Sequence, residues 1–142
     1  KPPAVVTGDP HFRTWRGNTF SYHGECDLVL IKSAMFGSGL GLDLHIRTKR
    51  KHWWSFVQNA AVRIGSDILE VTSDNTHFLN GVLNAELPSN IGGYKVKKSV
   101  VKSPFSLVYV VDLGGDQTIK ISRGKRRMLS VDVSQNPKIF HD

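Results

Sequence analysis

The chain has little cysteine, few acidic residues and no long apolar run. Cys26 is the only cysteine among 142 residues, so no disulfide forms within the chain, and Cys26 is either a buried thiol or half of a bridge to a partner outside it. The apolar runs are shorter than the roughly 18 residues that a transmembrane helix needs, so we expect no membrane span. The chain starts at Lys1-Pro2-Pro3 without a methionine or a signal-like segment, and we therefore expect a domain excised from a longer protein.

The shortage of acidic residues leaves a strong positive charge. Lysine and arginine number 19 against 12 acidic residues, a net charge of +7, and such a chain attracts acidic polysaccharide, anionic surfaces or nucleic acid. Zinc-finger spacing and the aromatic-basic signature of RNA-binding sheets are both missing, so we expect no nucleic-acid partner. The hydrophobic fraction of 39% and the length are typical of one soluble globular domain, which we place at 1–142.

The basic residues are clustered along the sequence. The candidate polyanion-binding residues are Arg47, Lys49, Arg50, Lys51, Lys125, Arg126 and Arg127. The alternative is that lysine and arginine simply occupy solvated strand faces and hairpin tips. The sequence leaves both interpretations open.

Period-2 alternation predicts strands along most of the chain. The clearest case covers residues 40–47, where leucine and isoleucine alternate with polar residues and His45 falls on the exposed side. Asn80-Gly81 favours a two-residue hairpin loop, and Trp53 and Trp54 should face opposite sides of one strand. The other predicted strands are 28–31, 53–57, 62–64, 68–71, 78–83, 94–101, 105–113, 118–122 and 128–133. Short strands without a helical period indicate an all-β sandwich or barrel.

Gly8-Asp9-Pro10-His11 is the stretch whose local sequence points to covalent chemistry. Pro10 has no N–H, so the Asp9 carboxyl is left to attack its own main-chain carbonyl and expel the Pro10 nitrogen, favoured by proximity. In an extended chain His11 lies on the same face as Asp9 and is placed to donate a proton to that nitrogen. The alternative is an inert Gly-Asp-Pro turn that leads into a strand.

The residues give no support for a multi-turnover enzyme. A nucleophile elbow, a metal-ligand cluster and a pair of catalytic carboxylates are all missing from the sequence. The six histidines (His11, His23, His45, His52, His77 and His141) show no metal spacing, and we interpret them as scattered surface residues. We therefore expect at most a single-turnover self-cleavage at Asp9–Pro10.

The opening stretch belongs to a longer pattern. This pattern runs from Gly8 through Thr14-Trp15 to Phe20 and continues as Phe20-Ser21-Tyr22-His23-Gly24-Glu25-Cys26-Asp27-Leu28-Val29-Leu30. It resembles the start of the von Willebrand factor type D domain. Leu79-Asn80-Gly81-Val82 followed by Leu87-Pro88 is similar to a hairpin of that family. The closing rhythm Ile119-x-Ile121 and Leu129-x-Val131-x-Val133 also fits.

This resemblance implies a secreted, extracellular module with a two-sheet antiparallel β-sandwich. It also implies a place in a multidomain parent chain, and matrix, mucin-like or acidic polysaccharide partners. In the members that keep an intact Asp-Pro bond it implies autocatalytic cleavage between the positions of Asp9 and Pro10, with a reactive Asp anhydride able to cross-link. His11 occurs in the wider family even without that bond, which implies a structural role for it.

Three departures from the family pattern concern calcium and disulfides. Arg16 replaces the usual calcium-binding Asp, and a guanidinium has no acceptor for a metal. The C-G-L-C-G-N loop that supplies further ligands is not in this chain, so we expect no cofactor and do not carry the calcium site over. The family's first cysteine would fall near Ala4 and is missing, while Cys26 aligns with the second. We therefore expect core burial, rather than disulfides, to hold the fold.

Overall fold

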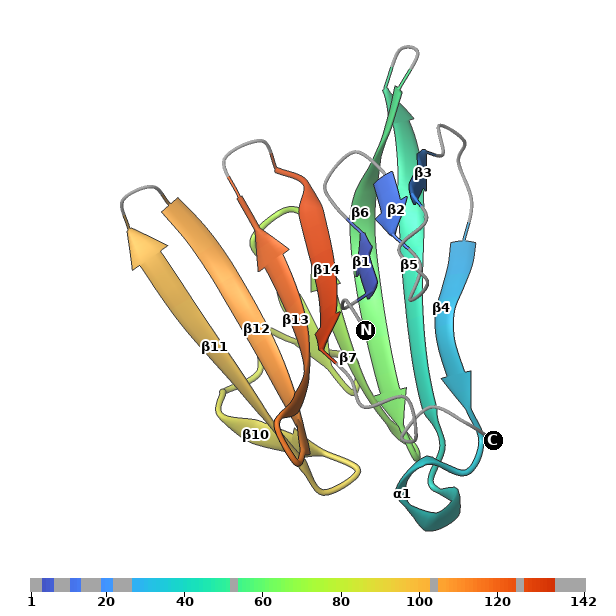
Figure 1. Ribbon diagram of the computed structural model, residues 1–142. Helices are drawn as coiled ribbons and strands as arrows, with labels where there is room; N and C mark the ends of the chain where they lie inside the picture. Colours follow the sequence, from blue (N-terminus) through green and yellow to red (C-terminus); the bar gives the residue numbers. More distant parts are fainter. Residues whose placement is uncertain are drawn as a thin grey trace.

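The computed structural model describes residues 4–6, 11–13, 19–21, 27–51, 54–102, 105–124 and 127–134, with the backbone alone for the first three segments and residue 54. Its strands form two antiparallel sheets (Figure 1). The first sheet contains, in spatial order, β10 (Ser89–Ile91), β11 (Tyr94–Lys102), β12 (Phe105–Gly114), β13 (Gln117–Arg123), β14 (Leu129–Ser134), β1 (Ala4–Val6), β2 (His11–Arg13) and β3 (Thr19–Ser21). The second contains β4 (Asp27–Ser33), β5 (Leu42–Lys51), β6 (Trp54–Ile64), β7 (Asp67–Thr72), β8 (His77–Leu79) and β9 (Val82–Leu83). The predicted all-β, two-sheet antiparallel sandwich is confirmed.

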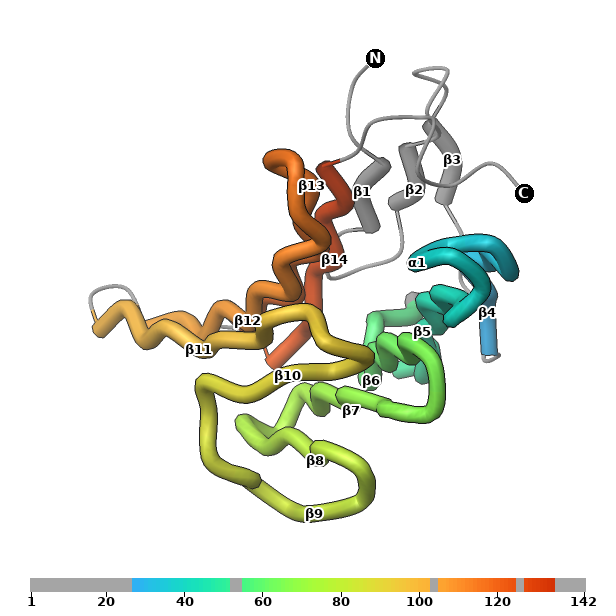
Figure 2. The backbone as a smooth tube through the Cα atoms, turned by 90° about the horizontal axis from the view of Figure 1, so that it is seen from below, coloured from blue at the N-terminus to red at the C-terminus, as the bar shows by residue number. Residues whose placement is uncertain are grey.

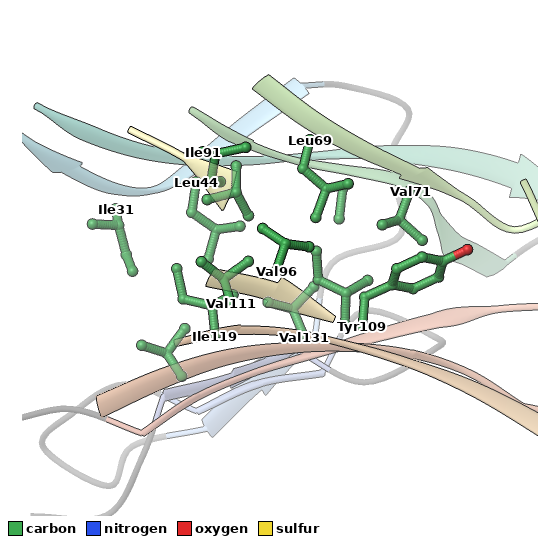
Figure 3. Packing of buried hydrophobic residues seen from close by; sticks show 14 of the residues in the cluster. Ile31, Leu44, Leu69, Val71, Ile91, Val96, Tyr109, Val111, Ile119 and Val131 are labelled. Carbon is green, nitrogen blue, oxygen red and sulfur yellow. The ribbon is translucent and has the colours of Figure 1, made fainter. Parts of the chain in front are cut away.

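The core lies between the sheets, where every second residue of the long strands points inward (Figure 3). On β5 the buried residues are Leu42, Leu44 and Ile46, and on β14 they are Leu129, Val131 and Val133. Each fully buried aliphatic side chain stabilises the fold by about 1.5–3 kcal/mol relative to exposure. Burial on this scale is the source of stability that the sequence predicts for a chain with one cysteine. Cys26, Arg16 and Trp53 lie outside the described residues.

Several local predictions are confirmed. Asn80 and Gly81 have φ values of 51° and 82°, and Leu79 pairs with Val82, as expected of a two-residue hairpin with left-handed positions at both loop residues. His45 is exposed on β5, on the polar side of its strand.

Other local predictions are wrong for identifiable reasons. Residues 54–57 and 62–64, which were predicted to lie in two strands, belong to the single strand β6 (Trp54–Ile64), and Trp53 lies outside the described residues. A bulge near Gln58, where Arg47 pairs with Asn59 but Thr48 pairs with Val57, changes which residues point inward and so interrupts the alternation. The three-residue strand β10 was too short to give a pattern. Between the predicted strands 28–31 and 40–47 lies a four-residue helical turn, α1 (Phe36–Gly39).

His77 is not a surface residue, contrary to the sequence-based interpretation. It is buried at 3% exposure, and its Nδ1 lies 3.0 Å from the Tyr109 hydroxyl of the facing sheet. Its Nε2 lies 2.7 Å from the Ala85 carbonyl oxygen, which accepts only, so Nε2 carries the hydrogen and Nδ1 accepts from Tyr109. His77 is therefore a polar bridge between the sheets, with its ring edge-on to the Tyr109 ring.

The two ends of the sandwich are made of different connections (Figure 1). We call the end with α1, the β6–β7 turn at Gly65–Ser66 and the β10–β11 turn at Gly92–Gly93 the closed end. Viewed from below, β10 crosses beside β7 (Figure 2), so the two sheets come together there.

Candidate polyanion site at the basic end

Three hairpin connections lie at the end opposite α1 (Figure 1). They join β5 to β6, β11 to β12 and β13 to β14. We call this the basic end, because its described residues include Lys49, Arg50, Lys51, Lys102, Arg123 and Arg127. Strand ends that are far apart in sequence thus place their cations at one end of the molecule.

A hollow of about 300 Å³ lies at this end. We call it the basic hollow, and its lining residues are Lys49, Arg50, Lys51, Phe56, Gln58, Ser73, Asp74, Arg127 and Met128. The lining combines the β5–β6 tip, the turn between β7 and β8, and the residues directly before β14. Four lining residues are cationic and one is acidic, so the hollow carries a net positive charge.

The cations of the basic hollow are largely unneutralised. Among the described residues, Lys49, Lys51 and Arg127 have no carboxylate within ion-pair distance. All three are exposed, and the backbone N–H of Asp74 donates a hydrogen bond within the turn, to the Thr72 hydroxyl oxygen at 3.2 Å. Concave sites lined by charge of one sign concentrate the potential and attract counter-ions.

Arg127 has an unusual backbone conformation. Its φ is +54°, in the left-handed region that costs a non-glycine residue roughly 1–2 kcal/mol. Its N–H lies 3.4 Å from the Gly124 carbonyl oxygen, which closes a turn. A left-handed position that suits glycine is thus occupied here by an arginine.

The floor of the hollow is fixed from below. The Ser73 N–H donates to the Gln58 carbonyl oxygen at 2.8 Å, and the Ser73 carbonyl oxygen accepts from Nε of Arg123 at 3.2 Å. Arg123 is 7% exposed and its guanidinium lies over the Phe105 ring, 5.7 Å from its centre. A buried cation from the first sheet thus holds the β7–β8 turn of the second and adds positive potential beneath it.

Arg47 differs from the other predicted basic residues. Its Nε donates to the Asp27 carboxylate at 2.8 Å, and this hydrogen bond holds the pKa of Asp27 below its usual value and raises that of Arg47. Arg47 is not among the described residues that line the hollow. Of the seven predicted cations, the structure brings Lys49, Arg50, Lys51 and Arg127 together, and Lys125 and Arg126 lie outside the described residues.

Asp9 and Pro10 also lie outside the described residues, and His11 is described by its backbone alone. The strands on either side are defined: Val6 of β1 pairs with Phe12 of β2, and His11 pairs with Ser21 of β3. Val6 also pairs with Val131, near the start of β14. β1 therefore ends, and β2 begins, at the end of the sheet where β14 begins, which is the basic end.

A second hollow, of about 590 Å³, lies over β7 and β8 and differs in charge. Its acids are already engaged, because Asp67 accepts from the Gly92 N–H at 2.8 Å and Glu70 accepts from Asn59 at 3.1 Å. Within the described residues no group of three or more His, Cys, Asp or Glu side chains could hold a metal ion. No described helix is long and apolar enough to span a membrane.

Sequence reasoning missed five lining residues: Phe56, Gln58, Ser73, Asp74 and Met128. The position of Gln58 in the hollow depends on the bulge in β6, and that of Ser73 depends on the turn between β7 and β8. Neither feature leaves a local signal in the sequence. Met128 was predicted only as the start of a strand. Met128 directly follows the basic residues that end at Arg127, and a residue next to a basic hairpin tip lies close to the same surface. This position was therefore a usable signal that Met128 belongs to the site.

The comparisons with known proteins agree with this architecture. The family model of the von Willebrand factor type D domain matches residues 4–138, and no curated protein matches the chain. Members of this family are structural modules, typically of extracellular multidomain proteins. Because the match covers nearly the whole length, the chain belongs to the von Willebrand factor type D domain family.

Proposed function

We propose that this chain is a secreted adhesive or matrix module that undergoes autocatalytic cleavage between Asp9 and Pro10. The observation that carries the proposal is the pairing of β1 with β2, with Val5 opposite Arg13 and Val6 opposite Phe12. This pairing leaves the Asp-Pro bond within a short connection, residues 7–10, whose two flanking strands are held in the same sheet. A connection anchored on both sides restricts the motion of the carboxyl relative to the bond it attacks, which raises effective concentration.

The proposed reaction is an intramolecular acyl transfer. One oxygen of the Asp9 carboxylate attacks the Asp9 main-chain carbonyl carbon, the C–N bond to Pro10 breaks, and the nitrogen leaves as a protonated amine. His11 supplies that proton. The product at Asp9 is a five-membered cyclic anhydride, which water opens to two carboxyl groups and which an amine or a hydroxyl opens to an amide or an ester. An amide or ester formed in this way would bond the N-terminal piece covalently to matrix, and the rest of the module would stay attached to that piece through the pairing of β1 with β14 and β2.

The test is intact mass measured under denaturing conditions after incubation near pH 5 and near pH 7.5, the range over which histidine titrates. Denaturation is required because β1 pairs with both β14 and β2, so a cleaved N-terminal piece stays bound in the native protein. We expect fragments Lys1–Asp9 and Pro10–Asp142, and an added primary amine appended to Asp9.

Two substitutions make this test specific. Asp9→Asn removes the nucleophile and should abolish cleavage, whereas Asp116→Asn, at an exposed turn before Gln117, should leave it unchanged. A full-length mass that persists for days at both pH values would refute the self-cleavage. Equal cleavage in Asp9→Asn would point instead to a contaminating protease.

A second function, polyanion binding, is favoured by the basic hollow. Four cations from two chain segments, the β5–β6 tip and the residues directly before β14, converge on a concave surface, and the net charge of +7 acts in the same direction. Acidic polysaccharide is the extracellular polyanion that fits the family's setting. This function does not depend on cleavage, and its general test is retention on an acidic polysaccharide that weakens steeply as salt rises. Retention that does not change with salt would contradict it.

A further inference from the structure

The basic hollow combines cations with features that a bare anion site does not need. Phe56 and Met128 are half-buried in its wall, and Asp74 adds a carboxylate among the cations. We propose that the hollow binds one acidic sugar unit, a uronate or a sulfated hexose, within an extracellular polysaccharide. This inference rests on the proposed polyanion-binding function and names the ligand class and the residues that recognise it.

The anionic group of the sugar has suitable partners. Arg127 presents a planar fork that matches the two oxygens of a carboxylate or sulfate, and such bidentate contacts add direction as well as energy. Lys49 and Lys51 act as point charges on the opposite strand tip. Because these cations come from both sheets, the anion would be contacted from more than one side.

The neutral part of the sugar also has partners. An aromatic face such as that of Phe56 suits the C–H face of a pyranose ring, and apolar walls with a few polar groups are typical of small-ligand sites. The Asp74 carboxylate is acceptor-only when ionised, so it suits sugar hydroxyls and opposes a ligand that offers negative charge alone. Its position among cations favours a sugar over phosphate polymers.

The size and backbone of the site agree with this assignment. The volume of about 300 Å³ is at the lower end of the roughly 300–1,000 Å³ of ligand sites, which suits one unit of a chain that continues into solvent on either side. Solvated hairpin tips would explain lysines in general. They do not explain an arginine at φ +54° that faces a lysine tip from the other sheet.

The experiment measures binding of the full chain to four probes at about 0.15 M salt: heparin, hyaluronan, neutral dextran and polyphosphate. Hyaluronan carries carboxylates without sulfate and heparin carries both groups, so this pair shows whether sulfate is required, and polyphosphate supplies charge without sugar. Lys51→Glu and Lys95→Glu form a matched pair, because both residues are exposed lysines but Lys95 lies near the start of β11, at the closed end. Asp74→Ala and Phe56→Leu test the sugar contacts, with circular dichroism to confirm folding.

We expect one of the acidic polysaccharides to bind, dextran not to bind and polyphosphate to bind more weakly. Lys51→Glu should weaken polysaccharide binding about tenfold or more, equivalent to about 1.4 kcal/mol, and Lys95→Glu less than about twofold. Asp74→Ala should weaken polysaccharide binding although it makes the chain more positive, and Phe56→Leu should weaken it too. Neither should weaken polyphosphate binding.

Three results would overturn the inference. Equal losses in Lys51→Glu and Lys95→Glu would show that net charge alone attracts polyanions, leaving the general function intact. Tighter binding of all polyanions in Asp74→Ala would show that the hollow accepts any anion. Absence of binding to all four probes would remove both the site and the polyanion function, without bearing on cleavage at Asp9–Pro10.

Discussion

At the closed end of the sandwich charged side chains bind one another, whereas at the basic end Lys49, Lys51 and Arg127 are exposed and have no carboxylate partner among the described residues. Asp67 accepts from the Gly92 N–H and from Asn80, and Arg63 donates to Asp43 at 2.7 Å and to the Gly65 carbonyl. The basic hollow, by contrast, has four cations and one carboxylate. Like charges repel one another, so this cluster does not stabilise the fold through its charge, and polyanion binding is the role that we propose for it.

The same contrast holds for packing. At the closed end Phe36 of α1 lies with its ring centre 5.1 Å from that of Tyr94, and Ile64 and Ile91 are fully buried. At the tips of β11 and β12, Val100, Val101 and Phe105 are exposed. Substitutions at the closed end should therefore reduce stability, and substitutions at the basic end should reduce binding.

The largest effect is expected for Gly92→Ala at the closed end. Gly92 has φ +53°, and a Cβ there would collide with the Ile64 side chain and lie 3.0 Å from the Ile64 carbonyl oxygen. Left-handed strain and overpacking together should lower the free energy of unfolding by at least about 3 kcal/mol. Gly93→Ala is the matched control, because φ is also positive but no atom lies within 4 Å of its Cβ. Equal losses by urea unfolding would refute the steric part.

The next effect concerns the bridge beside the β7–β8 turn that carries Ser73 and Asp74. Tyr109→Phe leaves Nδ1 of the buried His77 without its donor, and an unsatisfied buried acceptor costs roughly 1–3 kcal/mol. Tyr94→Phe, at a half-buried tyrosine for which the described residues show no hydroxyl hydrogen bond, should cost less. If the two variants unfold at the same urea concentration, the bridge does not stabilise the fold.

Tyr109 also predicts a pH dependence with a definite sign. Burial raises the pKa of Tyr109 to about 12, from 10.0 for the free group. The folded state therefore holds its proton more tightly than the unfolded state. The corresponding stability is present below pH 10.0 and is lost as the pH rises through about 12. Measured over that window, the wild-type chain should lose more stability than Tyr109→Phe, and parallel curves would contradict this assignment.

The alternation of apolar and polar residues along the sequence was sufficient to predict the fold but not the basic hollow. Strands such as β5 could be predicted because burial of Leu42 and Leu44 imposes alternation on neighbours in sequence. The bridge between His77 and Tyr109 joins positions 32 apart, and Arg123 reaches Ser73 across 50. Such pairs depend on how two sheets face each other, which alternation along one strand does not specify. The basic residues were predicted as clusters, while their convergence depended on strand order.

A smaller effect on stability, with a large effect on binding, is expected for Arg127→Gly at the basic end. Glycine relieves the left-handed strain at φ +54° but gains freedom in the unfolded chain, so the free energy of unfolding should change by less than about 1 kcal/mol. Binding of acidic polysaccharide should fall, since the guanidinium is lost. A variant that loses stability but keeps binding would reverse the assignment of this end.

The smallest effect is expected at the exposed pair of Asp27 and Arg47, where Arg47, unlike Lys49, Lys51 and Arg127, has a carboxylate partner. The hydrogen bond from Arg47 lowers the pKa of Asp27, so its contribution to stability is present above the unfolded pKa and is lost as the pH falls through the folded value. Both side chains are well exposed, and solvent screening makes that contribution slight. Asp27→Asn should therefore leave urea unfolding at neutral pH unchanged but release Arg47, and polysaccharide binding should tighten slightly at low salt and not at high salt. If binding tightened as much as it weakens in Lys51→Glu, recognition would depend on the field of the whole end rather than on contacts within the hollow.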